Sequence, residues 1–161
     1  MVKSMAGIFM FKYILLVLSL TLASAVCLSA QTPVEKVILD YSDVPGSRKF
    51  IAQGMGMILA RKFIRSTQVA PIASDVDQLY VLKMQGASQS TRDDFIRDLQ
   101  AALKSYEYYG EQPSNNGQVS VYVHYLSHDA IDELVIYNPA ISSVNSLYGH
   151  FTAPELMKLK K

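Results

Sequence analysis

The sequence predicts a single α+β domain over residues 31–161, in which helices pack on one face of a mainly antiparallel sheet. In the first half of this region, apolar residues recur at the 3.6-residue spacing of helices. After residue 106 the spacing changes to two, which is typical of strands, and short turns join these segments. Consecutive strands joined by short turns pair antiparallel, so we expect a C-terminal four-strand meander.

Two helices and a short strand are expected before residue 67. Residues 34–41 predict a helix with one apolar stripe, formed by Val34, Val37, Ile38 and Tyr41. The turn residues of segment 43–46 end it, and residues 47–52 follow as a strand candidate. Residues 53–66 then predict a helix whose core-facing stripe consists of Met55, Ile58, Leu59 and Phe63.

The middle of the chain predicts a buried strand and the strongest helix. Residues 71–77 are expected to form a loop, and the apolar run of residues 78–84 a strand. Ser90-Thr91-Arg92-Asp93 matches a capping box, in which a hydroxyl accepts a free backbone N–H at the start of a helix. The apolar stripe of this helix comprises Phe95, Ile96, Leu99, Leu103 and Tyr106.

The remaining sequence predicts four strands and a final helix. The strand candidates are residues 106–111, 118–126, 131–137 and 143–148. Asn115-Asn116-Gly117 is a hairpin signal, because Asn-Gly accepts the positive φ of such turns. A second capping box, with Thr152 and Glu155, predicts the start of a C-terminal helix.

Residues 1–30 have the pattern of a secretory signal peptide. Lys3 and Lys12 precede an apolar run over residues 14–26, and Ala30 supplies a small residue at the expected cleavage site. We therefore expect residues 31–161 to be exported, to the periplasm, the cell envelope or the outside. An uncleaved membrane anchor and lipidation at Cys27 are the alternatives.

The predicted export and the composition argue against disulfide bonds, thiol chemistry and nucleic-acid partners. Cys27 is the single cysteine, so cleavage after Ala30 leaves no thiol for disulfides, nucleophiles or metal ligands. The exported chain carries 13 basic and 14 acidic side chains, a net charge of −1, and no membrane span is expected in it. This near-neutral charge argues against a nucleic-acid partner. No cofactor motif stands out, so no cofactor is expected.

The sequence offers no clear catalytic or metal site. The densest group of metal-ligand types comprises His124, His128, Asp129, Asp132 and Glu133. Strand geometry separates His124 and His128 by roughly 13 Å, whereas zinc requires both nitrogens at about 2.1 Å. A hairpin turn with solvated charges is therefore the preferred interpretation, and we assign no catalytic or metal residue.

A block of basic residues is the first candidate binding surface. It consists of Arg48, Lys49, Arg61, Lys62 and Arg65, with no acidic residue between Asp43 and Asp75, and a basic tail follows at Lys158, Lys160 and Lys161. Such a surface could bind anionic lipid headgroups, lipid A phosphates or an acidic protein. The alternative is a solvated helix flank balanced by acids elsewhere in the fold.

Tyrosines give the second candidate surface. Tyr108, Tyr122 and Tyr137 all fall in predicted strands, where tyrosine suits both sheet packing and the binding of peptides or glycans.

Several short motifs, taken in order, resemble the exported Bacteroidota proteins of domain-of-unknown-function family 4252. They are segment 41–46, strand 79–84, Phe95 and Leu99 in a helix, Tyr106, strand 119–125, segment 132–136 and segment 147–152. The resemblance spans nearly all of residues 31–161. It implies an exported location and a shared domain, and it assigns no activity and no catalytic residue.

These observations predict an exported, non-enzymatic binding or accessory module, whose partner is an anionic envelope component or another envelope protein. A hydrolase whose site assembles only in the fold is the alternative, as is an envelope stress or regulatory factor.

Overall fold

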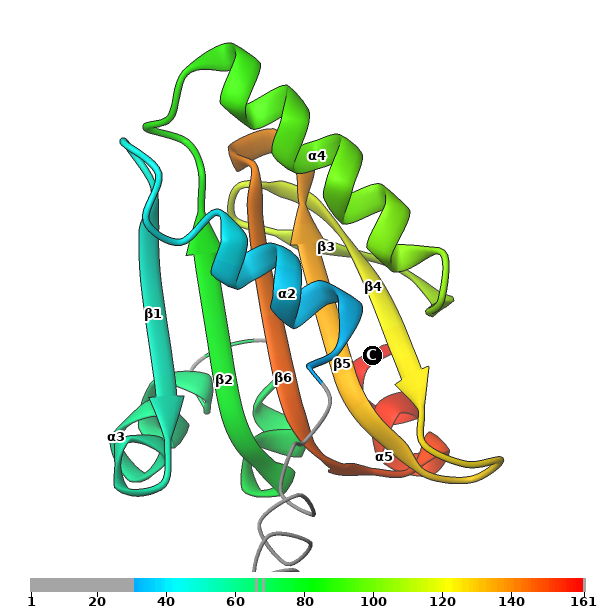
Figure 1. The fold of residues 1–161 in the computed structure, drawn as a ribbon. Coiled ribbons are helices and arrows are strands. Elements are labelled where there is room, and N and C mark those ends of the chain that lie inside the picture. The colour runs from blue at the N-terminus through cyan, green and yellow to red at the C-terminus, as the bar shows by residue number, and fades with distance from the viewer. Residues whose placement is uncertain (1–30, 66, 68, 161) are drawn as a thin grey trace, which may run out of the picture. The chain divides into compact units, whose positions relative to one another are not determined.

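A six-stranded antiparallel sheet organises the chain (Figure 1). The computed structural model describes residues 31–65, 67 and 69–160, so the predicted signal peptide, its cleavage point and Cys27 lie outside the described residues. The strands are β1 (Arg48–Gln53), β2 (Val76–Lys83), β3 (Glu107–Ser114), β4 (Gly117–Tyr125), β5 (Ile131–Asn138) and β6 (Ser143–Phe151). Their order in the sheet is β1-β2-β6-β5-β4-β3.

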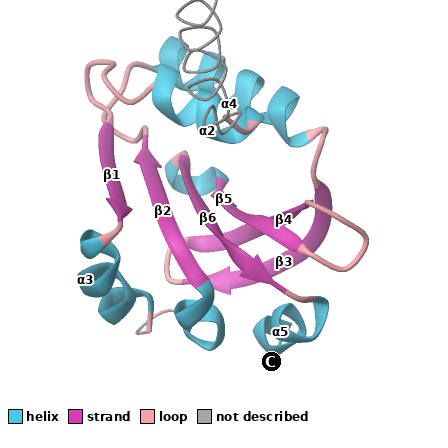
Figure 2. Cartoon of the chain, turned by 60° about the horizontal axis from the view of Figure 1, so that its bottom comes forward, coloured by secondary structure: helices cyan, strands magenta, loops and turns pink. Residues whose placement is uncertain are grey.

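The predicted α+β class is confirmed, and the sheet is larger than the predicted meander. Strands β3, β4, β5 and β6 pair in succession, as the short turns predict. However, β6 also pairs with β2, and β2 pairs with β1. The two early strands therefore extend the same sheet to six strands. In Figure 2, β3 and β4 cross the direction of β1 and β2, as expected from the twist of antiparallel sheets.

The prediction that helices pack on one face was wrong, because helices cover parts of both faces (Figure 2). Helices α2 (Pro33–Asp40) and α4 (Gln89–Leu103) pack on one face, which we call the helical face. Helix α3 (Met55–Ile64), the 3₁₀ helix η2 (Ala70–Asp75) and α5 (Ala153–Met157) pack on the opposite face, which we call the groove face. The central strands carry apolar side chains on both sides, so both faces need cover.

The helical face is the more completely covered of the two. Phe95 and Leu99 of α4 and Ile38 of α2 are fully buried against the sheet. The two helices also contact each other, because the Tyr41 hydroxyl donates to an Asp98 carboxylate oxygen at 2.8 Å and its ring meets that of Phe95 edge-on. Helices α2 and α4 therefore cover the helical face, and the groove face is the more open side of the sheet.

Helix boundaries differ from the predictions at two places. The hydroxyl that caps α4 belongs to Ser88, not Ser90, and accepts the Thr91 backbone N–H at 3.2 Å. Residues 71–77 are not a loop, since η2 covers most of them and β2 begins at Val76. The second capping box is confirmed, with the Glu155 carboxylate accepting the Thr152 N–H at 2.8 Å.

Two further 3₁₀ segments are η3 (Pro139–Ile141) before β6 and η4 (Lys158–Lys160) after α5.

Across residues 31–65, 67 and 69–160, no helix has the length and apolar character needed to cross a membrane.

Helix α3 forms in the predicted segment but faces the other way. The predicted core stripe is exposed, with 84% of Met55, 60% of Ile58, 63% of Leu59 and 74% of Phe63 accessible. The helix instead buries Met57, Ala60 and Ile64 against the groove face. The larger apolar stripe of α3 therefore lies at the surface.

Candidate binding groove

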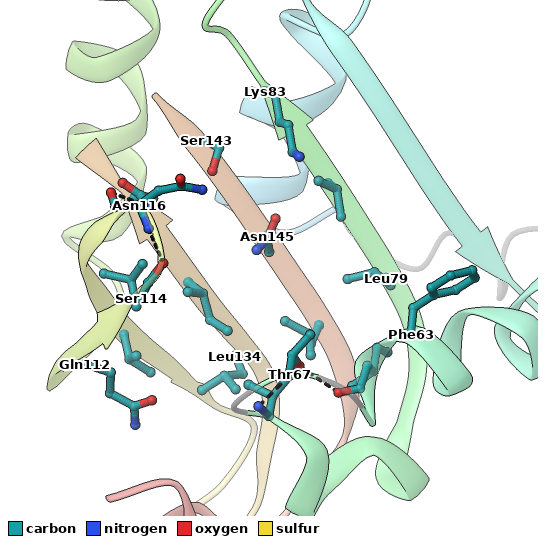
Figure 3. A pocket seen from close by; sticks show the side chains of 18 of the residues that line it. Phe63, Thr67, Leu79, Lys83, Gln112, Ser114, Asn116, Leu134, Ser143 and Asn145 are labelled. Carbon is teal, nitrogen blue, oxygen red and sulfur yellow. Dashed lines mark hydrogen bonds between the residues drawn. The ribbon is translucent and has the colours of Figure 1, made fainter. Parts of the chain in front are cut away.

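The open part of the groove face forms a groove of about 930 Å³ (Figure 3). Its floor is made by strands β2, β6, β5 and β4, and its sides by α3 on one side and the turn between β3 and β4 on the other. Natural ligand sites span roughly 300–1,000 Å³, so this groove has room for a small-molecule ligand.

The strand register arranges the groove floor in rows. One row joins Leu79, Leu147 and Leu134 across β2, β6 and β5. Because side chains alternate between the two faces of a strand, the next row on the same face is two residues further along. That second row contains Val81, Asn145, Ile136 and Val121.

The third row is polar and positively charged. It joins Lys83, Ser143 and Asn138, and Arg48 of β1 lies directly opposite Lys83. Like charges at such positions destabilise a sheet unless an anion or solvent screens them. Within the described part of the chain, neither Lys83 nor Arg48 makes an ion pair. The floor thus changes from apolar to cationic along the strands.

Asn145 is the one amide side chain placed centrally in the apolar rows drawn in Figure 3. It is half-buried between Val81 and Ile136, and no described residue hydrogen-bonds its amide. Sequence reasoning missed both Asn145 and Lys83. The available signal was an asparagine that lies between Ser143 and Leu147 on one face of the strand, but the identity of that face depends on the register.

The predicted basic surface is divided in the structure. Arg48 and Lys49 lie on β1 at the end away from α3, whereas Arg61, Lys62 and Arg65 lie on or just after α3 (Figure 1). Lys49 pairs with Asp43 at 2.7 Å. The Arg61 guanidinium donates to the Val76 carbonyl oxygen at 2.9 Å and lies 3.7 Å from Asp77. Lys62 and Arg65 are thus the cations of this block that stay exposed near α3.

The predicted tyrosine surface is reduced to one exposed ring. Tyr108 is 53% exposed and packs edge-on against the half-buried Tyr122, with ring centroids 5.5 Å apart. Tyr137 is only 7% exposed and belongs to the core of the helical face. Tyr137 therefore does not share an exposed face with Tyr108.

The predicted metal-ligand types are spread out. The His124 Nδ1 atom lies 2.7 Å from an Asp132 oxygen, whereas His128 and Asp129 are exposed in the turn after β4. The described residues contain no group of three or more histidine, cysteine, aspartate or glutamate side chains suited to one metal ion.

Glu133 is fully buried on the helical face, away from the groove. Its carboxylate accepts the Tyr106 hydroxyl at 2.5 Å and the Ser146 hydroxyl at 2.6 Å. Burial raises the pKa of Glu133, and these two hydroxyl groups oppose the rise. The same burial, together with the Glu133 charge, raises the pKa of Tyr106 and Tyr148. This solvent-inaccessible carboxylate links Tyr106 to Ser146 of β6.

Glu133 should make the protein less stable as pH rises. The unfolded chain ionises Glu133 at its ordinary pKa, while the folded chain holds the proton to a higher pH. Stability is therefore greatest below the ordinary glutamate pKa and falls until pH passes the raised folded value, by about 1.4 kcal/mol per unit of pKa difference. Urea unfolding between acidic and neutral pH should show this slope in the wild type and lose it in Glu133→Gln. Glu111→Gln removes an exposed carboxylate as a control, and an unaltered slope in Glu133→Gln would contradict the assignment.

Comparisons of the sequence with protein-family models and curated proteins, and of the fold with solved structures, give no match.

Proposed function

We propose that this protein is a non-enzymatic binding module that works outside the cytoplasm and holds a single-chain amphiphile in its groove. The apolar chain lies along the rows of Leu79 and Val81, and the anionic end reaches Lys83. The observation that carries the proposal is the open groove itself, with its change from apolar to cationic side chains along the floor. The predicted export signal and the resemblance to an exported family support the location.

The size of the apolar rows sets the expected affinity. About ten methylene groups buried at about 0.8 kcal/mol each supply roughly 8 kcal/mol, which corresponds to a dissociation constant near 1 μM. Ordering of a flexible chain reduces this binding free energy, so a micromolar dissociation constant is the tightest binding that we expect. The partly buried amide of Asn145 also needs a polar partner, which a bound carboxylate or its water can provide.

The proposal is tested by titrating the purified protein with a fluorescent long-chain fatty acid. Ile136→Phe puts a ring into the groove and displaces about two methylene groups, so binding should weaken about tenfold. Leu126→Phe adds the same ring in the turn after β4 and should leave binding unchanged. Absence of binding by the wild type, or equal binding by Ile136→Phe, would refute the groove as the site.

The position of the anionic end is tested with Lys83→Gln. An exposed ion pair contributes little, so fatty-acid binding should weaken only about threefold. Binding of the fatty alcohol of equal length should not change, because it carries no charge. Lys104→Gln, at the end of α4, is the matched control. An equal loss for acid and alcohol would place the headgroup elsewhere in the groove.

A further inference from the structure

Helix α3 presents large apolar side chains to solvent. Met55, Ile58 and Leu59 follow the spacing of one helix face and are all at least 60% exposed, and Phe63 continues the same line. We call these four residues the apolar stripe. On the opposite side of the helix, Met57, Ala60 and Ile64 are buried and fix its orientation on the sheet. Contiguous exposed apolar surface of this kind marks an interaction site.

The charged side chains of α3 and of the residue that follows it are all positive. Lys62 lies four residues after Ile58, which places it within the stripe, and Arg65 follows at the C-terminal end of the helix. Both are exposed, and no described residue forms an ion pair with either. No acidic residue occurs between Asp43 and Asp75. A lysine in this position can lay its stem along apolar surface while its ammonium group reaches outward.

We propose that α3 docks on an anionic lipid bilayer. The apolar stripe enters the boundary between headgroups and acyl chains, and Lys62 and Arg65 contact lipid phosphates. The combination of apolar side chains with unpaired cations fits this partner, because a bilayer supplies both an apolar layer and negative charge. Arg61 takes no part, since its guanidinium is held by the Val76 carbonyl.

The docked surface adjoins the groove. Phe50, which is half-exposed on β1, lines the groove together with Phe63 of the apolar stripe. Figure 3 shows Phe63 on the α3 side of the groove. Docking through α3 therefore brings one side of the groove to the membrane surface. The docking inference stands without a groove ligand, because it depends on the outward face of α3 alone.

The test is vesicle flotation of the full chain, with vesicles of phosphatidylcholine alone or mixed with phosphatidylglycerol. The wild type should bind the anionic vesicles, and added salt should weaken binding. The triple variant Met55→Ser, Ile58→Ser, Leu59→Ser and the double variant Lys62→Gln, Arg65→Gln should each bind about tenfold less. The control Leu126→Ser, Met157→Ser changes equally exposed apolar residues elsewhere. Every variant carries the same residues 1–30, so these residues cannot cause a difference between variants.

A fluorescence measurement locates the contact. The chain has no tryptophan, so Leu59→Trp introduces a single reporter. Its emission should shift to the blue with anionic vesicles and be quenched by brominated lipid, whereas Leu126→Trp should do neither. Equal vesicle binding by all variants, or an unshifted Leu59→Trp, would overturn the proposal. So would self-association in sedimentation velocity that the triple variant abolishes, because a second copy would then cover α3.

Discussion

Gly149→Ala is expected to destabilise the protein by about 3 kcal/mol or more, as overpacking against rigid backbone does. A Cβ atom at this position of β6 would lie 1.9 Å from the Asp75 carbonyl oxygen and 2.9 Å from the ring of Phe151. The carbonyl ends η2 and leads into β2, so it cannot move without disturbing the pairing of Val76 with Gly149. Urea unfolding measures the loss.

The matched control is Gly56→Ala in α3. No atom lies within 4 Å of a Cβ built at Gly56, and alanine restricts the unfolded chain more than glycine does. Gly56→Ala should therefore leave stability unchanged or raise it by up to about 1 kcal/mol. If the two glycine variants had equal stability, the close approach of η2 to β6 would be absent in solution.

The role of Gly149 illustrates what the sequence could not predict. Alternation of apolar residues over segment 118–126 predicted β4 within a residue, because β4 buries the side chains that carry the pattern. The predicted strand 131–137 matches β5 within a residue. The predicted strand 143–148 stopped short of Phe151. Gly149 follows directly after the predicted strand, and the structure uses it within β6 to admit a neighbouring backbone.

Helix α3 shows a second limit of the sequence. Hydrophobic periodicity identified the helix, and it assigned Met55, Ile58, Leu59 and Phe63 to the core because they recur at the spacing of one helix face. The face that packs on the sheet instead uses Ala60 and Met57, and Arg61 reaches a backbone carbonyl beside them. Periodicity reports which face is apolar and does not distinguish a core from a surface that another partner covers.

The groove could not be predicted, because its rows join residues that are distant in sequence. Lys83 and Ser143 become neighbours only through the pairing of β2 with β6. The basic block shows the reverse effect. Its members are close in sequence, but the length of β1 separates Arg48 from α3, and Asp43 and Asp77 approach from outside the block.

Phe95→Ala is expected to destabilise the protein by about 3–5 kcal/mol, which lowers the melting temperature by roughly 10–20 °C. The ring is fully buried between α4, α2 and the sheet, and its centroid lies 5.5 Å from that of Tyr41. Its removal leaves a cavity that Leu99 and Ile38 cannot fill without leaving their own contacts. Gln100→Ala, an exposed change on the same helix, should cost almost nothing in thermal unfolding.

The same variant separates stability from binding. Phe95 lies on the helical face, and the sheet stands between it and the groove. Below its melting temperature, Phe95→Ala should therefore bind the fluorescent fatty acid with wild-type affinity, whereas Ile136→Phe should lose affinity with little loss of stability. If Phe95→Ala weakened binding as much as Ile136→Phe while still folded, the two faces of the sheet would be coupled, and the groove could not be treated as a preformed site.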